Sequence, residues 1–510
     1  MDSMDSTESN RLSGSIGGSK WNQGGKSTAN AFVTRRQMLG AVIAAPIVTS
    51  LASGAAAGPA DQRLLVRPQD IRDLETRSKL VIELDGKLKL KPLESSKDSK
   101  ARLADVKAKS TLDYFETAVL DSEMDATISG RRYVEAKADT WIAGQSTNHE
   151  LRPECRQLIG MKESGSWQQY CPKETIDLRE TQLLHAPLNT AMLEKLLPAT
   201  PAKPDSEWKI SQEDAANIFN LEAALKSTLA ARITKVEAGI ATISLNGQID
   251  GTANSVPTSI NVKGSFQAKF TGKSILVTWV GLVLKEDRSI SQAEPGFKIT
   301  ARVRMIRESS AANKTGFTPE QLRNIAAKED PGRWLVRIQS EAGRFTMFGD
   351  RRWKTFVDTR EETVLRFVQD NMVIAQCNVS RLTDVKPGTQ VTVEGVQADI
   401  RDSLKGRFEE FLESNEQVTS SNLRLIRTVS AGTVEEVPIQ WIHNHLSDDE
   451  GHRFALICTM GANMTDKFAA HDEQMTASFR LLPQLDPAST ADAEERSAAK
   501  TTVEPESTKR

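Results

Sequence analysis

LVIELDGKLKL, residues 80–90, is the stretch that decides the fold. Every even position except Gly86 carries leucine or isoleucine, and from Glu83 onward every odd position is charged. A period of two is typical of a β-strand with one face in the core and the other in water. Gly86 inside this run predicts a bend or a bulge.

Strand-like runs continue along the chain from this stretch. They fall at residues 103–114, 131–142, 229–236, 239–249, 259–270, 274–285 and 297–306. Glycine-bearing turn signals lie among them, at Asn246-Gly247, Asp250-Gly251, Thr271-Gly272 and Pro295-Gly296. Short connections predict antiparallel strands, and long half-exposed strands predict a sheet that curls around a partner. Two helix-like segments, residues 190–197 and 212–225, are the candidates for that partner.

Residues 62–308 are therefore expected to form a long, curved antiparallel β-sheet domain with few helices. This arrangement resembles the curved sheet of periplasmic lipid-carrier proteins of the LolA type. The resemblance implies that the concave face holds a lipid or another apolar ligand. The alternative is that this face is filled by the protein's own core.

A second region is expected at residues 317–483, after a linker at 309–316. Thr318-Pro319 predicts a helix start, with threonine as the N-cap and proline in the first turn. Strand-like runs follow, then a helix over residues 393–413 with apolar side chains at three- and four-residue steps, then more strands and a short helix. This order predicts an antiparallel sheet with helices on its faces, so the fold class of the whole chain is α+β.

The order of these elements and the closing TASFR at residues 476–480 resemble the PsbP-like family. That family includes extrinsic proteins of the oxygen-evolving photosystem and small nuclear-transport cofactors. The resemblance implies an α/β sandwich domain that binds partners and does not catalyse. It carries over no metal, cofactor or partner residue.

Residues 34–60 have the pattern of an export signal. Arg35 and Arg36 precede a short apolar run and a small-residue exit, and this resembles a twin-arginine (Tat) signal. The resemblance implies a periplasmic or secreted protein that folds before export, with no stable transmembrane anchor after cleavage. Residues 1–33 and the tail 484–510 are expected to be disordered, because they are polar and poor in apolar side chains.

Composition limits the function. A net charge of −2 argues against nucleic acid as a partner. The residues Gly24-Gly25-Lys26-Ser27 fail as a phosphate-binding loop, because Lys20 stands where the motif needs glycine. No cofactor is expected. Several basic residues around an aromatic one suggest a solvated positive face or, alternatively, a site for an acidic partner. These are Trp353 with Arg351, Arg352, Arg366, Arg381 and Arg401.

The chain has four cysteines and six histidines. Cys155 and Cys171 flank a short stretch and could close a disulfide in an oxidising compartment. Cys377 and Cys458 lie in separate apolar runs, and two separate buried thiols are the favoured interpretation. The disulfide state of this second pair stays open.

Three histidines form the candidate metal site. His443 and His445 alternate on one strand face, and His452 lies across an acidic turn, so the three could converge as metal ligands. The plainer alternative is that they are solvated on the wet face of a strand.

Three functions follow from these patterns. The favoured one is an exported, non-catalytic protein that binds an unknown protein partner or an apolar ligand. The second is a periplasmic carrier of a lipid or other apolar ligand in the first domain. The third is a metal-dependent enzyme centred on the histidine hairpin.

Overall fold

The computed structural model describes residues 65–67, 75–91, 102–121, 125–163, 165–271, 274–292, 294–310 and 313–483. The leader 1–33, the signal 34–60 with Arg35 and Arg36, and the tail 484–510 lie outside the described residues. The described chain is β-rich and contains three antiparallel sheets.

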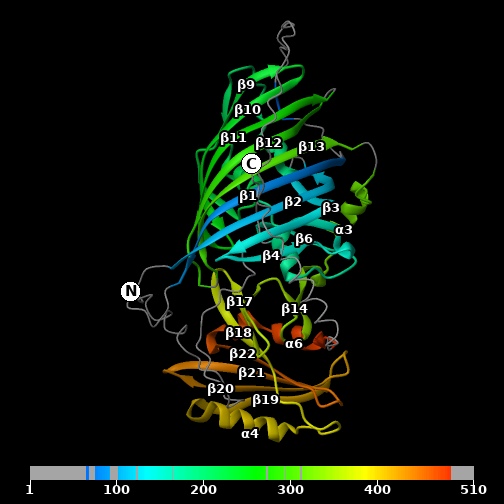
Figure 1. Cartoon of the computed structure of the whole chain (residues 1–510), viewed down its shortest axis with the longest axis vertical. Helices are drawn as coiled ribbons and strands as arrows, with labels where there is room; N and C mark the ends of the chain where they lie inside the picture. Colours follow the sequence, from blue (N-terminus) through cyan, green and yellow to red (C-terminus); the bar gives the residue numbers. More distant parts are fainter. Residues whose placement is uncertain are drawn as a thin grey trace, which may run out of the picture.

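The first sheet has 13 strands, and its main path runs β6-β5-β3-β2-β1-β13-β12-β11-β10-β9-β7. In Figure 1 its long strands lie side by side as one tilted, curved sheet. Its strands are β1 (Glu75–Leu90), β2 (Arg102–Leu120), β3 (Ala126–Ile142), β4 (Gln145–Glu150), β5 (Gln157–Glu163), β6 (Ser166–Tyr170), β7 (Glu207–Lys209), β8 (Ala223–Ser227), β9 (Ala230–Glu237), β10 (Ile240–Ala253), β11 (Val256–Thr271), β12 (Ser274–Arg288) and β13 (Gly296–Ser309).

Strand β1 lies near the middle of this sheet and confirms the predicted alternation. Leu80, Ile82 and Leu88 are buried. The predicted bulge at Gly86 is wrong, because β1 pairs with β2 and β13 in unbroken register through this residue. A Cβ at Gly86 would lie 2.3 Å from the carbonyl oxygen of Lys298. The glycine therefore serves the close approach of the neighbouring backbone, which a sequence pattern does not reveal.

Two of the predicted turns are also wrong. Asn246-Gly247 and Asp250-Gly251 lie inside β10, and the hairpin turns at Asn254-Ser255, where both residues have positive φ. A Cβ at Gly251 would lie 2.1 Å from a backbone oxygen of β8. The glycine lets β8 lie close against β10. In the sequence, the Asp-Gly pair that results from this requirement looks like a turn.

The concave face of the sheet is covered by the segment 176–221. This segment contains α1 (Leu178–Leu183), the 3-10 helix η3 (Thr190–Leu196) and α2 (Gln212–Ile218), while a further 3-10 helix, η2 (Pro153–Cys155), precedes β5. The predicted helix over 212–225 ends early, because Asn220 adopts a positive φ and the chain enters β8. Leu193, Leu196 and Ile218 join the hydrophobic cluster that also contains the inner side chains of β1 and β10–β13.

The second region contains a seven-stranded sheet, in the order β16-β17-β18-β22-β21-β20-β19, and a three-stranded sheet, in the order β14-β15-β23. Its strands are β14 (Leu335–Ser340), β15 (Phe345–Asp350), β16 (Trp353–Asp358), β17 (Glu362–Gln369), β18 (Met372–Arg381), β19 (Phe408–Val418), β20 (Arg424–Val434), β21 (Val437–Ser447), β22 (Arg453–Gly461) and β23 (Arg480–Leu481). Its helices are α3 (Pro319–Ala326), η4 (Pro331–Trp334), α4 (Val393–Leu404), η5 (Lys405–Arg407), η6 (Ala462–Met464), α5 (Thr465–Phe468) and α6 (His471–Ala477).

The start of α3 confirms the sequence prediction. The Thr318 hydroxyl accepts a hydrogen bond from the Gln321 amide, and Pro319 occupies the first turn. The helix predicted over 393–413 is wrong beyond Leu404. Lys405 adopts φ 51°, so α4 ends there and the chain continues as β19. The helix-like spacing of apolar residues continues beyond α4 in the sequence because Phe408 and Phe411 pack against the same hydrophobic cluster as α4.

The two regions are in contact (Figure 1). Arg337 of β14 binds the Asp177 carboxylate at 2.6 Å, and its amide donates to the Ile176 carbonyl. Of the segment 309–316, expected to be a linker, the described residues Lys314 and Thr315 are held by the first sheet. There the buried Thr315 donates its amide to the Glu75 carboxylate. Among the described residues, no helix is long and apolar enough to span a membrane.

Candidate functional site

The structure does not bring the three predicted histidines together. His443 and His445 lie in the interior of β21, on the same face as Trp441, which packs against α4. They are 8% and 7% exposed, so the alternative that they are solvated is wrong for both. Trp441 on this face packs with Val396, Ile400 and Leu404 of α4, so α4 covers a strand face that looks half-exposed in sequence.

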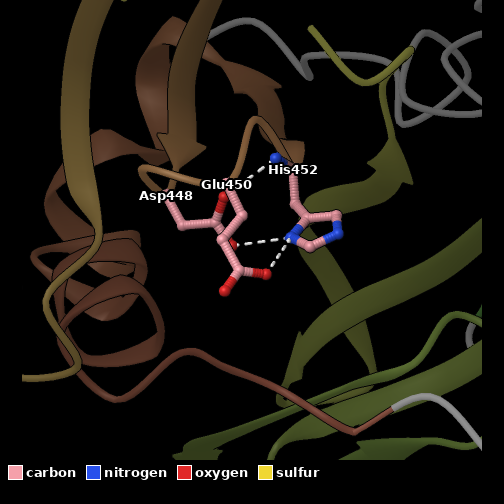
Figure 2. A group of neighbouring side chains, drawn as sticks. All are labelled: Asp448, Glu450 and His452. Atoms are coloured by element: carbon pink, nitrogen blue, oxygen red, sulfur yellow. Dashed lines mark hydrogen bonds and ion pairs between the residues drawn. The ribbon is translucent and has the colours of Figure 1, made fainter. Parts of the chain in front are cut away.

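His452 instead forms a group with two carboxylates at the turn between β21 and β22. The ligand-type atoms of Asp448, Glu450 and His452 lie within 4.8 Å of one another. Figure 2 shows both carboxylates directed at the same ring nitrogen of His452. Asp448 lies 2.7 Å from that nitrogen, and its other oxygen accepts the His452 amide. Burial acts to raise the pKa of Asp448, but the hydrogen bonds from His452 outweigh it and hold the pKa below its usual range.

The geometry of this group is that of a closed hairpin turn. Three ligands around a metal point their donor atoms at a common empty position. Here the Asp448 carboxylate is hydrogen-bonded directly to the ring nitrogen of His452, and the Glu450 side chain is largely exposed. These contacts indicate that the group stabilises the turn between β21 and β22.

Burial makes His443 and His445 sensitive to pH. It lowers the pKa of each to about 4, and for His445 the nearby Arg453 and Arg424 add to the effect. In the unfolded chain both histidines bind protons below about pH 6.5. The folded state does not follow until about pH 4, so stability is lost as the pH falls from 6.5 to 4. We expect each histidine to contribute a loss of up to about 1.4 kcal/mol per pH unit in that window.

Denaturant unfolding at pH 7 and pH 4.5 measures this loss. His445→Leu should lose less stability between the two pH values than the native chain does, because the variant removes one titrating group from an apolar site beside Ile426. His149→Asn, on the short outer strand β4 of the first sheet, is the control for the loss of a histidine as such. An identical pH dependence in His445→Leu and the native chain would contradict the assignment.

Cys155 and Cys171 lie together as free, buried thiols. The Cys171 sulfur lies 3.6 Å from the carbonyl oxygen of Glu154, the residue before Cys155, and the Arg152 guanidinium lies 3.3 Å from the Cys155 sulfur. The contact with Cys155 and hydrogen bonds from the Lys173 and Glu174 amides lower the pKa of Cys171 to about 6. The geometry thus brings the two predicted cysteines together, and the disulfide between them stays a prediction.

Cys377 and Cys458 are two free, buried thiols, as the favoured interpretation expected, but they do not lie apart. They are directly opposite residues in the antiparallel pair β18–β22. The proximity of Cys377 raises the pKa of the Cys458 thiol, and burial adds to the effect. The sequence concealed this because β18 and β22 are separated by α4 and three strands.

Strand β19 is the most exposed long strand of the second region, and sequence reasoning missed it. It forms one end of the seven-stranded order, and β20 is its partner on the inner side. Every residue after Phe411 in this strand is exposed, including Leu412 and Val418 at 53% and 67%. Its two register shifts lie between Phe408 and Glu413, and the pairing from Glu413 to Val418 is regular.

The concave face of the first sheet is filled by buried side chains. Two buried ion pairs lie where η3 meets the sheet. Arg131 pairs with Glu116, and Arg307 pairs with Glu194 of η3. The apolar side chains around them belong to the main hydrophobic cluster. Among the described residues, segment 176–221 therefore occupies the concave face on which the carrier hypothesis places an apolar ligand.

No family model matches this chain, and no curated protein matches it. A solution structure of cyanobacterial PsbP (CyanoP) from Synechocystis sp. PCC 6803 is similar at 11% identity, over 30% of this chain and 98% of that one, with a TM-score of 0.24. A lipovitellin structure is similar at 7% identity, over 48% of this chain and 26% of that one, with a TM-score of 0.27. A protein from Bacteroides thetaiotaomicron VPI-5482 is similar at 9% identity, over 34% of this chain and 63% of that one, with a TM-score of 0.22. Scores this low carry no argument about function.

Proposed function

We propose that the protein is exported, is non-catalytic, and acts by binding a protein partner along strand β19. The partner we infer is an extended basic segment that adds to the edge of the seven-stranded sheet. The observation that carries the proposal is the exposure of β19 as an end strand. An end strand presents a row of backbone donors and acceptors to any chain that can pair with it.

The charge of β19 supports a basic partner. Four glutamates lie on this strand: Glu409, Glu410, Glu413 and Glu416. Glu413 and Glu416 form ion pairs with Arg427 and Arg424 of β20, while Glu410 is exposed and forms no ion pair among the described residues. A second copy of β19 would place acidic side chains opposite one another, and like charges in that arrangement are destabilising.

Apolar side chains on the same strand support pairing rather than a purely ionic contact. Val418 is exposed in the regular part of the strand, where the side chains of a paired strand would contact it, while the exposed Leu412 lies at the second register shift. The two register shifts near Phe408 hinder pairing in the first half of β19, because bulges disrupt the ladder. The regular half, Glu413 to Val418, is therefore the part that the partner pairs with.

Hydrogen exchange of the full chain with defined peptides tests the proposal. An alternating Lys-Val peptide should slow amide exchange in residues 413–418, with an affinity that falls as salt rises. The matched Glu-Val peptide should not. Glu410→Lys with Glu416→Lys should weaken binding of the basic peptide, and a charge reversal at Glu237, in the first sheet, is the control. Equal protection by both peptides, or protection outside β19, would sink the proposal.

The other two hypotheses require changes that the contacts oppose. Carriage of an apolar ligand requires segment 176–221 to leave the concave face and break buried ion pairs. Metal-dependent chemistry on the histidine hairpin requires His443 and His445 to approach His452, although they lie in the interior of β21. Binding along β19 requires no rearrangement of the fold.

A further inference from the structure

We propose that Cys377 and Cys458 form a disulfide when the chain folds in an oxidising solution, and that this bond links β18 to β22 inside the seven-stranded sheet. The two strands are neighbours in the sheet but distant in the chain. The bond would therefore close a long loop that contains α4 and β19 to β21.

The register places the two sulfurs within bonding reach. Directly opposite residues of an antiparallel pair have Cα atoms about 4.5–5.5 Å apart. A disulfide needs about 4.4–6.8 Å, so no backbone movement is required. The pairing is regular on both sides, with Gln376 opposite Thr459 and Asn378 opposite Ile457. Directly opposite residues of a pair point to the same face of the sheet, and both side chains are buried there, so the two sulfurs share one side of the β18–β22 pair.

Burial separates this pair from Cys155 and Cys171. Cys377 and Cys458 are 0% and 1% exposed, so an oxidant in solution cannot reach them while the sheet is closed. Cys171 is 8% exposed, and the lowered pKa of its thiol favours the reactive thiolate. The folded protein should therefore oxidise at Cys155 and Cys171 first, and the second bond should form only during folding or opening of the sheet.

The chemistry is thiol–disulfide exchange with a low-molecular-weight disulfide as the oxidant. One cysteine thiolate attacks a sulfur of the small disulfide, forms a mixed disulfide and releases one small thiolate. The second cysteine thiolate then attacks the protein sulfur of the mixed disulfide and releases the second small thiolate. Two protein thiols lose two electrons and two protons, and one small disulfide becomes two thiols.

Refolding of the full chain tests the proposal. The reduced protein is unfolded in guanidinium chloride and refolded in a mixture of reduced and oxidised glutathione. Free thiols are then alkylated, and the protein is digested without reduction for mass spectrometry. We expect the Cys377 and Cys458 peptides to be linked in most soluble molecules. The folded, reduced protein in the same mixture should keep both thiols at least ten times longer than it keeps those of Cys155 and Cys171.

A Cys155→Ser/Cys171→Ser variant isolates the second bond. Its oxidised form should melt about 10 °C above its reduced form, because the bond restricts a long loop in the unfolded chain. Should this variant fail to fold, the peptide map of the native sequence still decides the question. Soluble refolded protein with both Cys377 and Cys458 alkylated, or with either one linked to Cys155 or Cys171, would overturn the proposal.

Discussion

Replacing Arg131 by methionine is expected to lower the free energy of unfolding by about 3–5 kcal/mol. Arg131 and Glu116 form an ion pair at 2.6 Å beneath η3, with side chains that are 5% and 1% exposed. The guanidinium also lies 4.8 Å from the centre of the Tyr114 ring. Methionine fills similar space but leaves the Glu116 carboxylate buried without its cation, and that uncompensated charge is the source of the loss.

A double variant separates charge from packing. Glu116→Gln with Arg131→Met removes both charges, and we expect it to recover a large part of the loss, because the buried ion pair is costly to desolvate. The surface pair between Arg302 and Asp85 provides the control, with both side chains about half exposed. Arg302→Met should cost less than about 1 kcal/mol. Denaturant unfolding measures all three, and equal losses for the buried and the surface arginine would contradict the argument.

Replacing Trp353 by alanine is expected to cost about 3–5 kcal/mol in the second region. Trp353 is fully buried at the start of β16, with its ring 5.2 Å from that of Phe367 and 6.0 Å from that of Phe468. Alanine would leave a cavity between the seven-stranded sheet and α5, which the surrounding backbone cannot close.

Trp353→Phe should be much milder than the alanine variant. The ring keeps most of the contacts, and the indole N–H has no hydrogen-bond partner among the described residues. Trp141→Ala is the control for loss of a tryptophan, because Trp141 is 39% exposed on β3. Thermal unfolding followed by tryptophan fluorescence and by calorimetry measures these differences. A Trp353→Ala variant as stable as Trp141→Ala would show that the ring is not part of the core.

Trp353 also illustrates what a sequence leaves out. The arginines around it suggested an aromatic residue on a positive surface. In the structure Trp353 is fully buried, so it is not on a surface. Arg351 lies above Trp334, Arg366 above Phe356 and Arg401 above Phe411, so these arginines contact different aromatic rings. Which side chain lies inside depends on the neighbours of β16, and these come from distant parts of the chain.

The strands themselves were largely predictable, because alternation is a local property. Where the prediction failed, a local pattern had a distant cause. Gly86 and Gly251 resembled bulge and turn signals, but they serve close approach of other strands. Phe408 and Phe411 extended a helical period because they join the cluster beneath α4. The neighbours of Cys377 and His443 follow from the strand order of the sheet, which no sequence motif specifies.

Because Cys377 and Cys458 are buried, their oxidation state depends on the compartment in which the chain folded. A chain that folds in a reducing cytosol and then crosses a membrane intact would arrive outside with these two sulfurs already sealed off from oxidants. A chain that crosses extended and folds outside would acquire the bond on the way to its native state. The number of free thiols on protein recovered from the cell envelope would therefore show whether the chain folded before or after it crossed the membrane, independently of the leader sequence.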